Sequence, residues 1–115
     1  GYTGLPYMLA ADPAVPGRVW LASGWAGVHR SDDAGATWRP LLAGDARYVF
    51  VGGGRVAAGL ADGVSLTEDG GAAWRPADPS LPFKVHPIPA LTPSRLIVGT
   101  HGTGLLWMPL DPLAR

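Results

Sequence analysis

An internal repeat constrains the fold of this chain more than any other feature of its sequence. The segment from Ser31 to Pro40 matches the segment from Thr67 to Pro76, and Asp69 follows Asp33 by 36 residues. A Gly-Val step precedes each copy at the same offset, and a Gly-Leu step recurs further on. Short apolar segments keep the same period, each opened by an arginine: they begin at Arg18, Arg55 and Arg95. A period of this length indicates a repeat architecture.

Each repeat unit has the composition of a set of short β-strands. The chain contains 17 Gly and 12 Pro interleaved with apolar runs, and 47% of its residues are hydrophobic, which argues against disorder. We expect strands at residues 7–10, 19–23, 28–31 and 37–41, then 48–51, 56–60, 64–67 and 73–75, then 85–91, 96–100 and 105–108. The third unit lacks a fourth strand.

Four antiparallel strands in about 40 residues match one blade of a β-propeller. The predicted fold is therefore all-β: a single partial propeller over residues 1–115, with blades at about 5–43, 46–78 and 83–110. It is either part of a larger propeller or half of a ring.

The repeated motif resembles the Asp box of a known family. Ser31, Asp33, Gly35, Thr37 and Trp38 form the pattern Ser-x-Asp-x-Gly-x-Thr-Trp. This pattern is similar to the Asp box of bacterial sialidase (BNR) repeats, which sortilin-type propellers, xyloglucanase-like glycosidases and photosystem-assembly propellers also contain. The second copy keeps most of the pattern, as Thr67, Asp69, Gly71 and Trp74, with Ala73 in place of the threonine.

The motif has a physical rationale as a structural turn. A carboxylate in the turn between the third and fourth strands can accept hydrogen bonds from main-chain N–H groups that lack ladder partners. Glycine two residues later supplies a positive φ, and the tryptophan anchors the hairpin between blades. We therefore expect Asp33 and Asp69 to be structural rather than catalytic.

Composition excludes several classes of partner and cofactor. Nine basic residues balance nine acidic ones with no basic cluster, so nucleic acid is not an expected partner. The chain has no cysteine and no His-x-x-x-His spacing, so we expect no metal and no other cofactor. No apolar run approaches the roughly 18 residues that cross a bilayer, so no membrane insertion is expected.

The sequence favours binding over catalysis. The resemblance to sialidases implies an arginine cluster, a Tyr–Glu nucleophile pair and an acid/base aspartate, and glycosidases in general need two convergent carboxyl groups. The chain has one glutamate, Glu68, which lies within the second motif. We therefore expect a non-catalytic module that binds or scaffolds a protein or a glycan. The alternative is a piece of a sialidase-like glycoside hydrolase whose catalytic residues lie outside this chain.

Two residues are candidates for ligand binding. Trp25 stands in a glycine-flanked turn, where an aromatic ring could stack on a sugar or peptide, and His101 follows a strand at a Gly-rich turn. Trp20 and Trp107 are expected in the core, and His29 on an exposed strand position.

Three blades in an open arc would leave apolar sheet faces bare. Either further blades or a second copy of the chain, paired head to tail, could close the ring. Because the first residue is Gly1, we expect an excised or processed piece. The sequence leaves the compartment open; the family resemblance favours a secreted or periplasmic protein, and the Arg-, Ala- and Gly-rich composition favours a bacterium.

Overall fold

The computed structural model describes residues 6–77, 87–100 and 104–111, which form eleven β-strands. The first sheet consists of β1 (Met8–Ala11), β2 (Val19–Ala22), β3 (Val28–Ser31) and β4 (Arg39–Leu42). The second consists of β5 (Ala46–Gly52), β6 (Arg55–Leu60), β7 (Gly63–Thr67) and β8 (Arg75–Pro76). The third consists of β9 (Ile88–Leu91), β10 (Arg95–Thr100) and β11 (Gly104–Pro109). Within each sheet the strands pair antiparallel in chain order.

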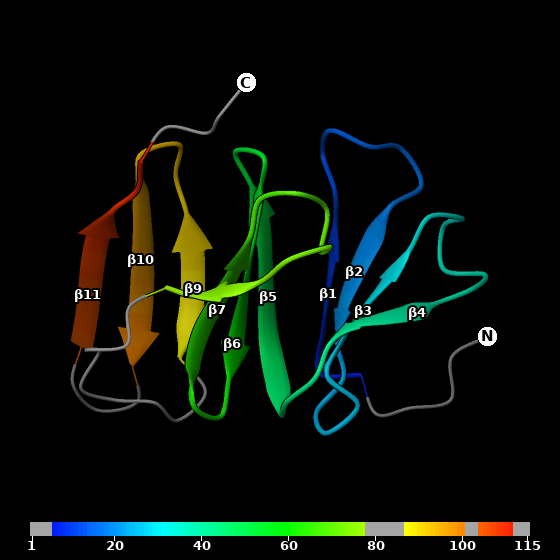
Figure 1. Cartoon of the computed structure of the whole chain (residues 1–115), viewed down its shortest axis with the longest axis horizontal. Helices are drawn as coiled ribbons and strands as arrows, with labels where there is room; N and C mark the ends of the chain where they lie inside the picture. Colours follow the sequence, from blue (N-terminus) through cyan, green and yellow to red (C-terminus); the bar gives the residue numbers. More distant parts are fainter. Residues whose placement is uncertain (1–5, 78–86, 101–103, 112–115) are drawn as a thin grey trace.

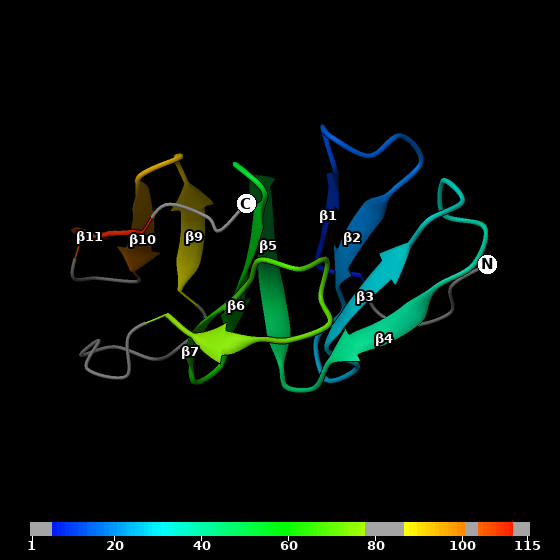
Figure 2. The ribbon, with the colours of Figure 1, turned by 45° about the horizontal axis from the view of Figure 1, so that its top comes forward.

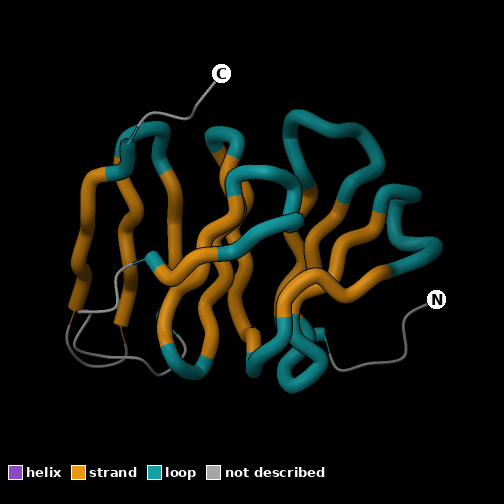
Figure 3. The backbone as a smooth tube through the Cα atoms, viewed as in Figure 1, coloured by secondary structure: helices purple, strands orange, loops and turns teal. Residues whose placement is uncertain are grey.

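The three sheets follow one another along the longest axis of the molecule, as Figures 1 and 2 show. Their first strands adjoin, since β1 contacts β5 and β5 contacts β9. Figure 3 shows strands joined by loops, and none of the described residues is helical. Successive antiparallel sheets with their first strands together are arranged as propeller blades. The predicted all-β fold of three blade-like sheets, with four, four and three strands, is confirmed.

The fourth strands of the first two sheets begin later than the sequence predicted. They were expected at residues 37–41 and 73–75, but they begin only at Arg39 and Arg75. The residues before them form hydrogen-bonded turns, so their N–H groups bond to side chains rather than to a strand ladder. The third sheet has three strands among the described residues, as predicted. The expected start of its first strand, at residue 85, lies outside the described residues.

The three sheets share one register. The second strand of each sheet pairs with the third through equivalent residues: Val19 with Ser31, Val56 with Thr67, and Leu96 with Met108. Because side chains alternate along a strand, equivalent residues face the same way in all three sheets. The second sheet therefore presents one face to the first sheet and the opposite face to the third.

Two apolar layers hold the sheets together. The layer between the first and second sheets contains Trp20, Ala22 and Val28 on one side and Val49, Val56, Ala58 and Leu60 on the other. The ring of Trp74 packs edge-on against Trp20, with centroids 6.1 Å apart and planes at 82°. The layer between the second and third sheets contains Ala57, Val64, Leu66, Leu91, Leu96 and Val98. Burial of these side chains is the main force that stacks the sheets.

Two expectations about single residues were wrong. Trp107 was expected in the core, but it is 58% exposed on the outer face of the third sheet, where no further sheet covers it among the described residues. His29 was expected to be exposed, but its side chain is buried, and desolvation lowers its pKa. Alternation along a strand shows which face a residue lies on, but not whether that face is covered.

Alanine substitutions at two equivalent glycines distinguish a loss of stability caused by tight packing from one caused by backbone strain. Gly35 and Gly71 occupy equivalent turn positions with φ of +94° and +96°, so alanine strains the backbone equally at both. A Cβ at Gly71 would lie 2.6 Å from Leu41 and 3.1 Å from Trp20, whereas at Gly35 it would meet only Trp38, at 3.7 Å. We expect Gly71→Ala to lower the free energy of unfolding by about 1–3 kcal/mol more than Gly35→Ala does. Urea denaturation measures both; equal losses would contradict the tight packing of the sheets at Gly71.

Candidate functional site

The turn between β3 and β4, which we name the Asp33 turn (residues 31–38), is closed by side-chain hydrogen bonds. The hydroxyl of Ser31 donates to Asp33 Oδ1 at 2.7 Å and accepts the N–H of Gly35 at 2.8 Å. The same oxygen, Asp33 Oδ1, also accepts the N–H of Thr37 at 2.8 Å, and Asp33 Oδ2 accepts the Thr37 hydroxyl at 2.5 Å. Trp38 Nε1 donates back to the carbonyl of Gly35 at 3.0 Å. One carboxylate thus joins both arms of the hairpin.

The turn between β7 and β8, the Asp69 turn (residues 67–74), repeats this network. Thr67 Oγ1 donates to Asp69 at 2.8 Å and accepts the N–H of Gly71 at 3.0 Å. Asp69 accepts the N–H of Ala73 at 3.0 Å, and Trp74 Nε1 donates to the carbonyl of Gly71 at 3.1 Å. The second turn has no equivalent of the hydroxyl bond that Thr37 makes in the first, because alanine stands at position 73.

These bonds keep both carboxylates ionised. The Thr37 hydroxyl, the Thr37 N–H and the Ser31 hydroxyl lower the pKa of Asp33 to about 2. The N–H of Ala73 and the hydroxyl of Thr67 lower the pKa of Asp69 in the same way. A general acid near neutral pH needs a pKa close to the working pH. Neither aspartate has one, so neither is suited to act as a general acid near neutral pH.

A second acidic position in each turn pairs with arginines, which sequence reasoning missed. Asp32 contacts Arg18 and Arg30, each at 2.9 Å, and Glu68 contacts Arg55 at 2.9 Å and Arg75 at 3.2 Å. The Arg18 and Arg55 contacts come first among the causes that lower the pKa of Asp32 and Glu68 respectively. The available signal was the arginine that opens the second strand of each repeat.

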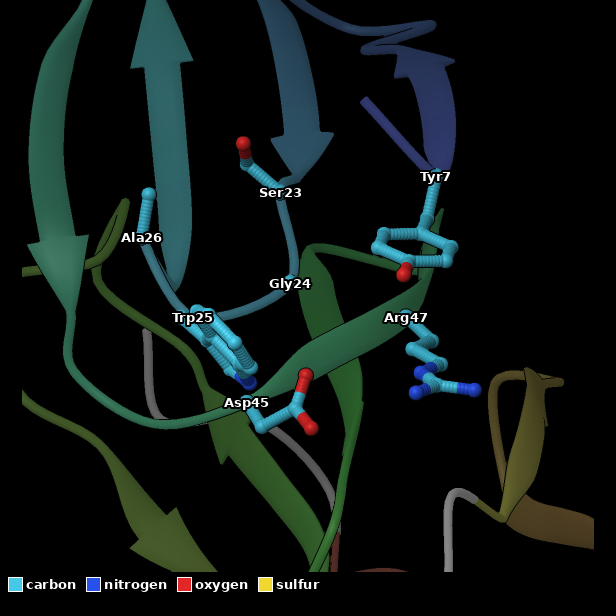
Figure 4. A pocket seen from close by; sticks show the side chains of 7 residues that line it. All are labelled: Tyr7, Ser23, Gly24, Trp25, Ala26, Asp45 and Arg47. Carbon is cyan, nitrogen blue, oxygen red and sulfur yellow. The ribbon is translucent and has the colours of Figure 1, made fainter. Parts of the chain in front are cut away.

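A pocket lies at the opposite end of the sheets from the two turns, where the β2–β3 and β4–β5 connections meet. It has a volume of about 340 Å³ and lies between Tyr7, Trp25, Asp45 and Arg47, with Ser23, Gly24 and Ala26 completing its wall. Figure 4 shows the ring of Trp25 beside the carboxylate of Asp45, and the ring of Tyr7 above the guanidinium of Arg47. Aromatic surface and charged groups of both signs therefore converge on one hollow.

The backbone holds this pocket firmly. Gly24 and Ala46 exchange two main-chain hydrogen bonds of 2.7 and 3.0 Å, which tie the β2–β3 turn to the start of β5. The ring of Tyr7 rests on Gly24, where an added Cβ would lie only 2.8 Å from it. Tyr7 also stacks with Arg47, whose guanidinium carbon lies 5.0 Å from the ring centroid. Trp25 is 91% exposed on this rigid turn. An exposed indole on a fixed backbone loses little entropy when it binds a ligand.

The other ligand-binding candidate of the sequence, His101, lies outside the described residues. A second hollow of about 420 Å³ lies between the first two sheets at the end that carries the aspartate turns. Its charged members include Arg18 and Arg55, which already pair with Asp32 and Glu68. The described residues contain no cluster of three potential metal ligands, and no helix among them could cross a membrane.

Comparison with known proteins places this fold among propeller proteins. No family model and no curated protein matches the chain. YCF48 from Cyanidioschyzon merolae superposes with a TM-score of 0.73 at 21% identity, over 92% of this chain and 37% of that one. An ancestral GH74 enzyme superposes with a TM-score of 0.64 at 16% identity, over 97% and 19%. YCF48 bound to D1 peptide superposes with a TM-score of 0.59 at 24% identity, over 93% and 42%.

These similarities establish the fold of the chain and its extent relative to those proteins. It spans between 19% and 42% of their lengths. The chain is thus equivalent to a part of a propeller, and the resemblance predicted from the sequence is supported at the level of the fold.

The pKa of Asp33 leads to a prediction about acid stability. Its pKa of about 2 in the folded protein lies below the ordinary pKa of 3.8. At pH values above 3.8, ionised Asp33 therefore stabilises the folded state. This contribution is lost as the pH falls through the folded pKa. We expect the free energy of unfolding to fall less between about pH 5 and pH 2 in Asp33→Asn than in the wild type. Chemical denaturation at the two pH values measures it, and identical pH dependence in both proteins would refute the assignment.

Proposed function

We propose that this chain is a non-catalytic binding module whose ligand site is the pocket around Trp25. The observation that carries the proposal is the 91% exposure of Trp25 beside a hollow that Tyr7, Asp45 and Arg47 also line. An exposed aromatic ring next to hydrogen-bonding groups suits a sugar ring or a peptide side chain. The proposed ligand is accordingly a glycan or a segment of another protein.

In this proposal the two aspartate turns are Asp boxes that stabilise the scaffold. Ser31, Asp33, Gly35, Thr37 and Trp38 have this role in the first, with Thr67, Asp69, Gly71 and Trp74 in the second. Their hydrogen bonds are internal to the hairpins, and they lie at the far end of the sheets from the pocket. A ring completed by further blades or by a second copy would bring more residues to the pocket end of the sheets.

Catalysis by a glycosidase mechanism is the weaker alternative. Among the described residues, Asp45 is the one carboxylate that lines the pocket. Hydrolysis of a glycosidic bond needs two carboxyl groups on either side of it. A sialidase-like activity would therefore depend on residues outside the described part of the chain, whereas binding at Trp25 requires none of them.

Substitution of Trp25 tests the proposal. We expect the wild-type chain to bind members of a glycan array or a peptide array, and Trp25→Ala to weaken that binding at least about tenfold, the effect of a central aromatic anchor. Trp25→Phe keeps a flat ring and is expected to retain most of the affinity. Equal binding by wild type and Trp25→Ala, or no binding by the wild type to either array, would rule out this function.

A further inference from the structure

The arginine of the pocket differs from most arginines of the chain because it has no acidic partner. Five other described arginines pair with Asp32 or Glu68, at nitrogen–oxygen distances between 2.9 and 3.8 Å. No described carboxylate pairs with Arg47, and its Nε, which is shielded from solvent, donates to no acceptor among the described residues. The positive charge of this guanidinium is therefore neither paired nor fully hydrated, which costs free energy. An anion that reached the guanidinium would offset this cost.

A β-bulge in β5 places Arg47 at the pocket. Ala46 and Val49 both lie in the apolar layer between the first and second sheets, although strict alternation puts residues three apart on opposite faces. The register shifts between Ala46 and Tyr48, which pair with two consecutive residues of β6, so Arg47 is the extra residue. Bulges redirect a side chain and are frequent beside active sites. In β5 the bulge keeps the apolar residues in the core while Arg47 lines the hollow.

Tyr7 holds the guanidinium in place. The N–H of Tyr7 donates to the carbonyl of Ala22 at 2.8 Å, which fixes this residue against the end of β2. The guanidinium carbon of Arg47 lies 5.0 Å from the centroid of the Tyr7 ring, as Figure 4 shows from close by. An arginine that stacks on a ring keeps the N–H groups at its edge available to a planar acceptor. A carboxylate is such an acceptor, because it can take two parallel hydrogen bonds from one guanidinium.

The neighbouring acid limits the charge of the ligand. Asp45 lines the same hollow, and Figure 4 shows its carboxylate between the ring of Trp25 and the guanidinium of Arg47. A phosphate monoester carries nearly two negative charges at neutral pH, so this carboxylate would repel it more strongly than a group with one charge. The pocket therefore suits an anion with a single charge, such as a carboxylate.

The polar groups of the pocket favour a peptide over a sugar. A sugar ring carries several hydroxyl groups, and each one needs a hydrogen-bond partner when it leaves water. Ser23 and Asp45 already interact with other groups of the protein, and the side chain of Ala26 is apolar. Few side-chain partners therefore remain for a set of hydroxyl groups. A peptide segment needs only an apolar contact at Trp25 and one ion pair at Arg47, and the pocket offers both.

We propose that the pocket binds a peptide segment that carries a carboxylate beside an apolar side chain, with Arg47 pairing with the carboxylate and Trp25 covering the apolar group. This inference rests on the proposed function, because it assigns the ligand class of the same pocket. Arg47 then determines specificity, while Trp25 supplies apolar contact. The carboxylate belongs either to an Asp or Glu side chain of the ligand or to its C-terminus, since a guanidinium pairs with both in the same way.

An array of short random peptides tests the ligand class. It presents each peptide in two formats, one with a free C-terminus and one with a C-terminal amide, beside acidic and neutral glycans. We expect the wild-type protein to select peptides with an acidic residue next to an aromatic or aliphatic one in both formats if a side chain supplies the carboxylate. It should select the free format alone if the C-terminus supplies it. Selection of peptides without a carboxylate, or of glycans in place of peptides, would overturn this inference and leave a Trp25-dependent binding site standing.

Affinities for one selected peptide test the role of Arg47. Arg47→Gln removes the charge, and we expect it to weaken binding of the acidic peptide at least about tenfold. The amide analogue of the peptide should bind the wild type about as weakly, and Arg47→Gln should weaken binding of this analogue little further. Arg39→Gln is the matched control, because it changes the net charge equally at a side chain that is 62% exposed in β4. It should leave the affinity unchanged.

Three results would contradict the pairing of Arg47 with the ligand. These are an unchanged affinity in Arg47→Gln, an equal loss in Arg39→Gln, and equal binding of the acidic peptide and its amide analogue by the wild type. The last comparison uses the unmodified protein, so it does not depend on how a variant folds, and circular dichroism checks the folding of both variants. Loss of binding in Trp25→Ala with full binding in Arg47→Gln would refute this inference alone and leave the proposed function intact.

Discussion

The structure depends on an ionised carboxylate that accepts main-chain and side-chain donors within a hairpin turn. Such turns leave several N–H groups without ladder partners, and each one unpaired would cost free energy. Asp33 and Asp69 satisfy them, and the serine or threonine two residues earlier extends the network to the next glycine. The turn then places a tryptophan on the side of the sheet that faces the preceding blade. Trp74 packs on Trp20 in this way, so a local polar network determines where an apolar anchor stands.

Arginine joins these hairpins to one another. Arg55, with its side chain 2% exposed, contacts Glu68 of its own sheet and two carbonyls of the third unit. A guanidinium has several N–H donors in a fixed plane. A buried arginine can therefore bridge two elements while few of its donors are left without an acceptor. The apolar layers supply most of the attraction between sheets, while the arginines fix their alignment. Both interfaces between sheets therefore contain a hydrogen bond from an arginine to a main-chain carbonyl, although their apolar residues differ.

The fold could be predicted because the sequence signals that specify it are short motifs that recur in each repeat. Period, strand order and the incomplete third unit all follow from turn residues and apolar alternation. The arginine pairs could not be predicted in the same way, because Arg30 and Gly70 are 40 positions apart and meet only when the sheets stack. The same limit explains Trp107 and His29, whose burial depends on which face is covered. Trp25 was singled out from its glycine-flanked turn, but Tyr7, Asp45 and Arg47 join it only through the pairing of Gly24 with Ala46.

The aspartate turns and the pocket around Trp25 lie at opposite ends of the sheets. The aspartate turns close one end, while the pocket at the other end is built from connections that carry none of this network. Amide hydrogen exchange tests the central claim most directly, because Thr37 and Ala73 lie in exposed turns where protection can come only from the carboxylates. The account predicts slow exchange at both amides, lost at Thr37 in Asp33→Ala while the amides of β6 stay protected. Exchange in the wild type as fast as in an unstructured peptide would contradict it.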